Sequence, residues 1–171
     1  FGWVLGLILS GLAGLDYIFV SRVVGIVLAA GTVLLTFLLA ARCLERQALW
    51  WSLLPTALVG TNLSSAYWAQ SGLETAAFAF LSSLATYLFI IRSQLLAAVL
   101  VAAVLVRPEG ALLAGLLVVA EAATERRFPR FSVVTVGLAR LFSLPFAGFR
   151  LAYYGWLWPK PFYAKTDFGW D

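Results

Sequence analysis

Arg107-Pro108-Glu109-Gly110 is a charged stretch between two apolar runs, and it decides how the chain can fold. The run before it covers residues 95–106 and the run after it covers residues 111–120, and neither contains a charged side chain. Each run is shorter than the ~20 apolar residues that a helix needs to cross a bilayer. Because proline breaks a helix interior, the sequence predicts two short segments that turn at residues 107–110. Charge at membrane depth is costly, and it usually faces a cavity, a partner or a substrate.

The composition is far more apolar than that of soluble globular domains. Hydrophobic residues make up 63% of the 171 residues, and the mean hydropathy is +0.95, whereas soluble domains are ~45–50% apolar. Continuous apolar runs lie at residues 1–15, 19–41, 49–66, 73–91, 95–106, 111–120 and 131–149. We therefore predict an all-α, polytopic transmembrane protein with about six to seven membrane segments, including the short broken pair at 95–120. The length predicts a single module over residues 1–171.

Several classes of function are excluded by what the sequence lacks. It has no histidine and one cysteine, Cys43, so it cannot build zinc or haem sites from imidazole or thiolate ligands. A Ser-His-Asp or Cys-His catalytic set is excluded for the same reason. We expect no metal ion and no cofactor. The net charge of +4 fits the Lys and Arg bias of cytoplasmic loops in membrane proteins, and no basic patch indicates a nucleic-acid partner.

Arginine residues between the apolar runs predict the orientation of the chain in the membrane. Three joints contain them, at Arg42 and Arg46, at Arg92, and at Arg126, Arg127 and Arg130. If residues 95–120 form a hairpin, all three joints fall on one side, which the positive-inside rule assigns to the cytoplasm. If residues 95–120 form one kinked helix, the third joint moves outside, so the rule favours the hairpin. The hairpin places residues 67–72, residues 107–110 and the C-terminal tail together on the outer face.

The C-terminal tail, residues 150–171, is rich in aromatic side chains and is interrupted by Pro159 and Pro161. The two prolines forbid a regular helix through the middle of the tail. Aromatic side chains with polar edges favour the headgroup level of a membrane. We therefore predict an irregular aromatic loop that lies on the outer membrane interface. Because Phe1 opens an apolar run with no charged region before it, we expect the sequence to be an interior piece of a longer protein.

Three charged residues flank the predicted outer turns and are candidates for ligand binding. Glu74 follows Ser71 at the spacing of a helix capping box, which is a structural alternative to ligand binding. Glu109 follows Pro108 at the start of a predicted helix, where a carboxylate favours the helix dipole. Arg107 opposes that dipole, so a nearby anion would stabilise it, and phosphate suits the paired donors of a guanidinium. Alternatively, Arg107 pairs with Glu109 or reaches lipid headgroups.

Three stretches together resemble the motifs of a known family of membrane enzymes. Residues 67–75 read Tyr-Trp-Ala-Gln-Ser-Gly-Leu-Glu-Thr, and residues 107–110 read Arg-Pro-Glu-Gly. The third stretch begins at Arg150 and contains Tyr153-Tyr154-Gly155 and Phe162-Tyr163-Ala164-Lys165. In this order and spacing they are similar to bacterial integral-membrane glycosyltransferases of the GT-C type. The resemblance is nearest to the terminal arabinofuranosyltransferases.

The resemblance implies a multi-pass enzyme of the cytoplasmic membrane that takes a sugar from a polyprenyl-phosphate donor. It implies transfer of that sugar to an acceptor glycan on the outer face. The residues that it marks as substrate-binding are Glu74, Arg107, Glu109, Arg150, Tyr153, Tyr154 and Lys165. The acidic catalytic residues of the family lie in an outer loop that would precede Phe1, and Asp16 does not match their position. We therefore assign no catalytic residue within this chain.

Two other functions fit the same pattern. A non-catalytic structural subunit of a larger membrane assembly would need no catalytic residue, and its partners would be other membrane subunits. A fragment of a transporter would also use short broken helices with charge at their tips. Against the transporter, the sequence reveals no second broken pair to match the one at 95–120.

Overall fold

The computed structural model describes residues 2–44, 49–125 and 130–154, and all of the regular secondary structure in these residues is helical. The helices in chain order are α1 (Gly2–Leu12), α2 (Tyr17–Cys43), α3 (Leu49–Gly60), α4 (Leu63–Gln70), α5 (Thr75–Ile90), α6 (Leu96–Val106), α7 (Gly110–Glu125) and α8 (Arg130–Tyr154). The predicted all-α class is therefore confirmed.

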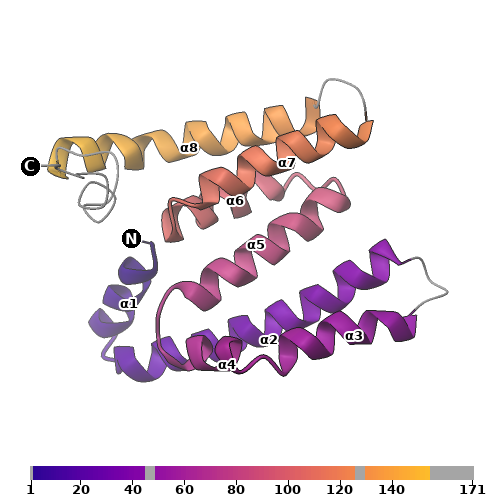
Figure 1. Cartoon of the computed structure of the whole chain (residues 1–171). Helices are drawn as coiled ribbons and strands as arrows, with labels where there is room; N and C mark the ends of the chain where they lie inside the picture. Colours follow the sequence, from indigo (N-terminus) through magenta and orange to yellow (C-terminus); the bar gives the residue numbers. More distant parts are fainter. Residues whose placement is uncertain (1, 45–48, 126–129, 155–171) are drawn as a thin grey trace, which may run out of the picture.

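Helix α5 lies in the middle of the molecule (Figure 1). On one side it packs against α2, which also contacts α3 and α4. On the other side it packs against α6, which in turn contacts α7 and α8. Helix α1 touches both α2 and α6, so it closes one end of the arrangement. Helix α5 therefore joins two helical layers that are far apart in sequence.

Several helix ends gather at two opposite ends of the molecule, whereas the α3–α4 connection lies between these ends (Figure 1). The α4–α5 turn, the α6–α7 turn and the C-terminal end of α8 lie at the end where the N-terminus lies. The C-terminal ends of α2, α5 and α7 lie at the other end. The 107–110 turn thus lies at the opposite end from the C-terminal ends of α2 and α5, and the side of a membrane that each end faces remains a prediction.

The predicted hairpin is present as α6 and α7. Helix α6 ends at Val106, and Arg107 has extended backbone angles of φ −142° and ψ 137°, as steric clash with a following proline favours. At Gly110, an added Cβ would lie 2.7 Å from the carbonyl carbon of Ala103, so the two helices approach too closely for any side chain there. Leu100 of α6 and Leu117 of α7 belong to the same buried core.

The buried core lies between α5, α6, α7 and α8. Its residues are small or aliphatic: Ala85, Leu88, Leu96, Leu100, Ala114, Leu117, Val136 and Ala139. By contrast, α1 has no buried residue, and only Ser21, Gly25 and Leu35 of α2 are buried. Many large apolar side chains outside this core are exposed, including Phe19, Trp50 and Leu112. Apolar surface on this scale is typical of a face that meets lipid or another protein.

One helix, α2, is long and apolar enough to cross a membrane by length and composition. Helices α4 and α5 pass the same test together, but they are bent by 117° at the break between them. Helices α1, α6 and α7, and residues 131–141 of α8, are apolar but shorter. The expected six to seven membrane segments therefore remain a prediction.

Several helix boundaries differ from the expected apolar runs, and two of these differences bear on the predicted motifs. The run at 49–66 is divided into α3 and α4, because the Asn62 side chain accepts a hydrogen bond from the Ser65 amide (3.2 Å) and starts a new helix. The last run does not end at residue 149, since α8 continues to Tyr154. No glycine or proline lies between Arg150 and Gly155, so nothing in this stretch ends the helix and the predicted loop does not begin at Arg150. The rest of the aromatic tail lies outside the described residues.

Candidate functional site

The 67–75 motif covers the end of α4, the α4–α5 turn at residues 71–74 and the first residue of α5, and the turn is built differently from the predicted capping box. Ser71 ends α4: its amide donates to the Tyr67 carbonyl (3.1 Å) and its hydroxyl donates to the Trp68 carbonyl (2.8 Å). Glu74 precedes α5 directly and makes no side-chain cap bond. The capping box is therefore wrong, because Ser71 has helical backbone angles and already serves the preceding helix.

The same turn is held in place by contacts from α1 and α2. The Trp3 indole N–H donates to the Gly72 carbonyl at 2.9 Å. Gly72 has a φ of +71°, and a Cβ there would lie 2.7 Å from the Ser21 hydroxyl oxygen. Helix α2 also approaches α4 closely: a Cβ on Gly25 would lie 2.2 Å from the Ala69 carbonyl oxygen. Glycine is thus required at two points, and the turn has little freedom to move.

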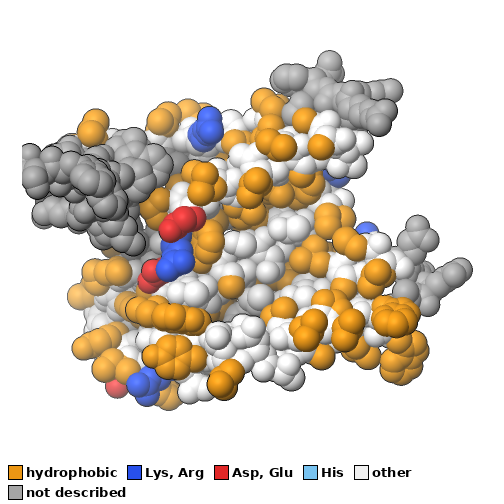
Figure 2. Space-filling view, in the orientation of Figure 1, with side chains coloured by type: hydrophobic (Ala, Val, Ile, Leu, Met, Phe, Trp, Pro, Cys, Tyr) orange, Lys and Arg blue, Asp and Glu red, His pale blue; other side chains and the backbone are white. Residues whose placement is uncertain are grey.

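Glu74 and Arg107 form an ion pair that joins the two turns. The Arg107 Nε and Nη2 atoms both lie 3.3 Å from the same carboxylate oxygen, Glu74 Oε1. The Arg107 side chain is 35% exposed and that of Glu74 is 34% exposed. The guanidinium lies 5.9 Å from the centre of the Phe78 ring. Figure 2 shows acidic and basic side chains gathered at one point of this face, surrounded by apolar and uncharged groups.

The other predicted site residues are placed less completely. Glu109 is exposed and makes no ion pair among the described residues, so the alternative pairing of Arg107 with Glu109 is wrong. Arg150, Tyr153 and Tyr154 belong to the last turns of α8, whose C-terminal end lies at the same end of the molecule as the α6–α7 turn (Figure 1). Lys165 lies outside the described residues.

A cavity of about 500 Å³ lies between α2, α4 and α5, beside the α4–α5 turn. Its lining comprises Ile26, Ala29, Ala30, Thr32, Val33, Val59, Gly60, Asn62, Ser64, Ser65, Ala66, Trp68, Ala69, Gln70, Thr75, Ala76 and Ala79. Most of these residues are small or apolar, and none carries a charge. A size of 300–1,000 Å³ and a mostly apolar lining with a few polar groups are usual for ligand pockets.

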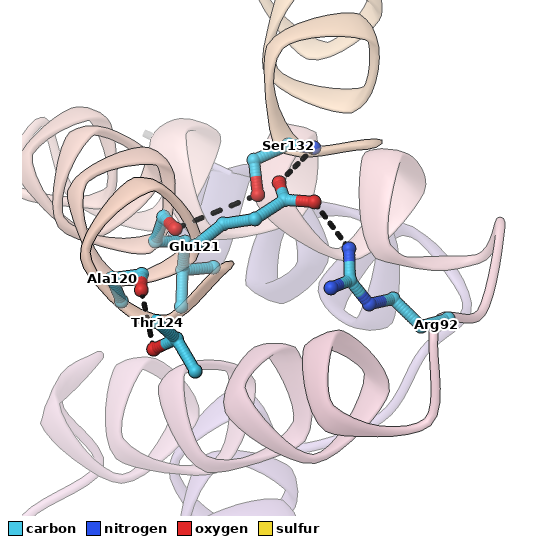
Figure 3. Close-up of polar contacts among 6 residues, drawn as sticks. Arg92, Ala120, Glu121, Thr124 and Ser132 are labelled. Atoms are coloured by element: carbon cyan, nitrogen blue, oxygen red, sulfur yellow. Dashed lines mark hydrogen bonds and ion pairs between the residues drawn. The ribbon is translucent and has the colours of Figure 1, made fainter. Parts of the chain in front are cut away.

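A second polar cluster lies near the C-terminal ends of α5 and α7 (Figure 3). Glu121 pairs with Arg92, and its second carboxylate oxygen accepts a hydrogen bond from the Ser132 amide at 2.7 Å. Arg92 has a φ of +57°, and its guanidinium lies 5.2 Å from the centre of the Phe131 ring. Sequence reasoning missed this cluster. The signal was a lone acidic residue, Glu121, directly after an apolar run.

The described geometry sets the chemistry that the site can perform. A guanidinium has five N–H donors, and Arg107 directs one from Nε and one from Nη2 at a single oxygen of Glu74, so its bonding capacity is only partly used. The surrounding surface supplies two carboxylates, those of Glu74 and Glu109. Within the part of the chain that the structure describes, no group of three His, Cys, Asp or Glu residues is placed to hold a metal ion.

Comparisons with protein-family models, with curated protein sequences and with solved structures found no match. The resemblance to GT-C type glycosyltransferases therefore remains a prediction from the three short stretches.

Proposed function

We propose that the chain is a module of a GT-C type glycosyltransferase, embedded as a multi-pass protein in the cytoplasmic membrane. It would take a sugar from a polyprenyl-phosphate donor and transfer it to an acceptor glycan on the outer face. The observation that supports this proposal is the Glu74–Arg107 ion pair, because it brings together two of the three motif stretches across 33 residues of sequence. The α8 end that bears Arg150 lies at the same end of the molecule.

In this proposal Arg107 binds the donor phosphate, since paired N–H donors suit phosphate oxygens. Arg150 and Lys165 would share the negative charge. Glu74 and Glu109 would accept hydrogen bonds from sugar hydroxyls. The cavity beside the α4–α5 turn supports an apolar donor, because its uncharged lining suits a prenyl chain.

Binding of farnesyl phosphate to the protein in lipid nanodiscs tests this proposal. We expect the wild-type protein to bind farnesyl phosphate more tightly than farnesol, which lacks the anion. Arg107→Ala should weaken phosphate binding at least about tenfold, because a hydrogen bond to a charged group contributes ~1.5–3 kcal/mol. Arg140→Ala is the matched control, since Arg140 is an exposed arginine of α8 outside the site. Equal losses in the two variants would contradict a phosphate site at Arg107.

A transporter-like substrate site is the second candidate, and one observation favours it. The α4–α5 pair is a second broken pair, bent by 117°, and its break meets the α6–α7 turn at the Glu74–Arg107 pair. Two broken helices with charge at their tips are typical of substrate sites in secondary transporters. Uptake of labelled inorganic phosphate into proteoliposomes, lost in Arg107→Ala, would favour the transporter. If the protein neither binds farnesyl phosphate nor takes up phosphate, the remaining candidate is a non-catalytic structural subunit.

A further inference from the structure

The Glu74–Arg107 pair has the geometry of a loose contact rather than a tight one. Two N–H groups of Arg107 converge on a single oxygen, Glu74 Oε1, at 3.3 Å each. Charge-assisted N–H···O bonds are usually ~2.7–2.9 Å long, and a well-formed arginine–carboxylate pair uses both oxygens. About a third of each side chain is exposed to its surroundings. Such a pair contributes little to stability.

Resting on the proposed function, we infer that Glu74 occupies the place of the ligand anion on Arg107 and is displaced when a phosphate binds. A phosphate group offers two oxygens to the Nε and Nη2 edge, where Glu74 offers one. It therefore makes the paired hydrogen bonds that the resting carboxylate leaves incomplete. Glu74 keeps the cation neutralised when no ligand is bound.

The displacement requires only the side chain of Glu74 to move. Its backbone carbonyl accepts a hydrogen bond from the Phe78 amide at 2.9 Å, within the first turn of α5. Two residues earlier, Gly72 is held by the Trp3 indole. Because the backbone is held on both sides, the released carboxylate stays next to the bound phosphate. There it is able to accept a hydrogen bond from a hydroxyl group of the ligand.

The test compares the affinity of purified variants for farnesyl phosphate in nanodiscs, with inorganic phosphate and farnesol as separate probes. Glu74→Gln removes the competing charge but keeps the length and shape of the side chain. We expect this variant to bind farnesyl phosphate about two- to fivefold more tightly than wild type, the range set by a partly exposed ion pair. Glu109→Gln removes an equal charge from the neighbouring turn without breaking an ion pair, so we expect a smaller gain.

Equal gains in Glu74→Gln and Glu109→Gln, or a loss in Glu74→Gln, would overturn displacement and leave Glu74 as a residue that positions Arg107. Glu74→Asp provides a second variant, because its shorter side chain weakens the pair while keeping the charge, and tighter binding is again expected. A loss of affinity in Glu74→Asp would count against the inference.

Failure of the proposed function has a different signature, namely that the wild-type protein binds farnesyl phosphate no more tightly than farnesol. Tighter binding of farnesyl phosphate than of inorganic phosphate assigns the site to a lipid phosphate.

Discussion

At the scale of single residues, Glu121 is the most heavily buried charge among the described residues. Its side chain is 2% exposed, whereas that of its partner Arg92 is 42% exposed. Both oxygens have partners, one in the Arg92 guanidinium and one in the Ser132 amide. A buried carboxylate is tolerated when it is paired and hydrogen-bonded in this way. Glu121 therefore ties the end of α7 to the start of α8 and to Arg92, two residues after the end of α5.

We predict that Glu121→Gln lowers the free energy of unfolding by about 1–3 kcal/mol, below the ~3–5 kcal/mol of a fully buried pair because solvent reaches Arg92. Chemical denaturation in detergent micelles, followed by circular dichroism, measures this loss. Glu109→Gln is the matched control on the same hairpin, and it should change stability by less than about 0.5 kcal/mol because Glu109 is exposed. Similar effects of the two substitutions would contradict a stabilising role of Glu121.

We predict that Gly72→Ala destabilises the protein by at least about 1–2 kcal/mol, since a side chain is strained at positive φ and its Cβ would meet the Ser21 hydroxyl. Gly115→Ala is the control, because Gly115 lies within α7 with nothing near the added Cβ. It should raise stability by about 0.5–1 kcal/mol through helix propensity. Thermal midpoints of both variants, compared with wild type, check the two opposite signs.

At the scale of helices, the α4–α5 break matters because it places a cavity beside the charged turn. Ala79 of α5 lines this cavity, so Ala79→Trp should fill part of it. We predict about a fivefold or greater loss of farnesyl phosphate affinity with no change for inorganic phosphate, because only the prenyl chain needs the apolar space. Ala57→Trp is the control, since Ala57 is exposed on α3 outside the lining. Loss of affinity for both probes would show that the substitution disturbs the turn instead.

The sequence predicted the helical class and the α6–α7 hairpin, because Pro108 and Gly110 act locally and lie between short apolar runs. The Glu74–Arg107 pair was harder to predict from the sequence, because a carboxylate at residue 74 could equally cap its own helix. Glu121 was overlooked because its partners, Arg92 and Ser132, are brought to it only by tertiary packing.

At the scale of the whole molecule, the two ends should face opposite sides of a membrane if the proposed topology is correct. Cys43 is the single cysteine of the chain and is exposed at the C-terminal end of α2. We predict that a membrane-impermeant maleimide labels Cys43 only from the cytoplasmic side. In a Cys43→Ser background, Glu109→Cys should be labelled only from the outer side. The side of labelling is read by comparing intact with inverted vesicles. Labelling of both positions from the same side would contradict the predicted topology.

Helix α5 also sets the spacing between the two charged clusters. Glu74 directly precedes α5, and Arg92 lies two residues after its last residue, Ile90. Its 16 residues, at 1.5 Å per residue, span about 24 Å. The hydrocarbon core of a bilayer is ~30 Å thick, so in the proposed multi-pass topology a modest thinning of the lipid would let both clusters reach headgroups. If the chain spans a membrane as proposed, the thickness of the bilayer should therefore determine how far each charged cluster lies from water.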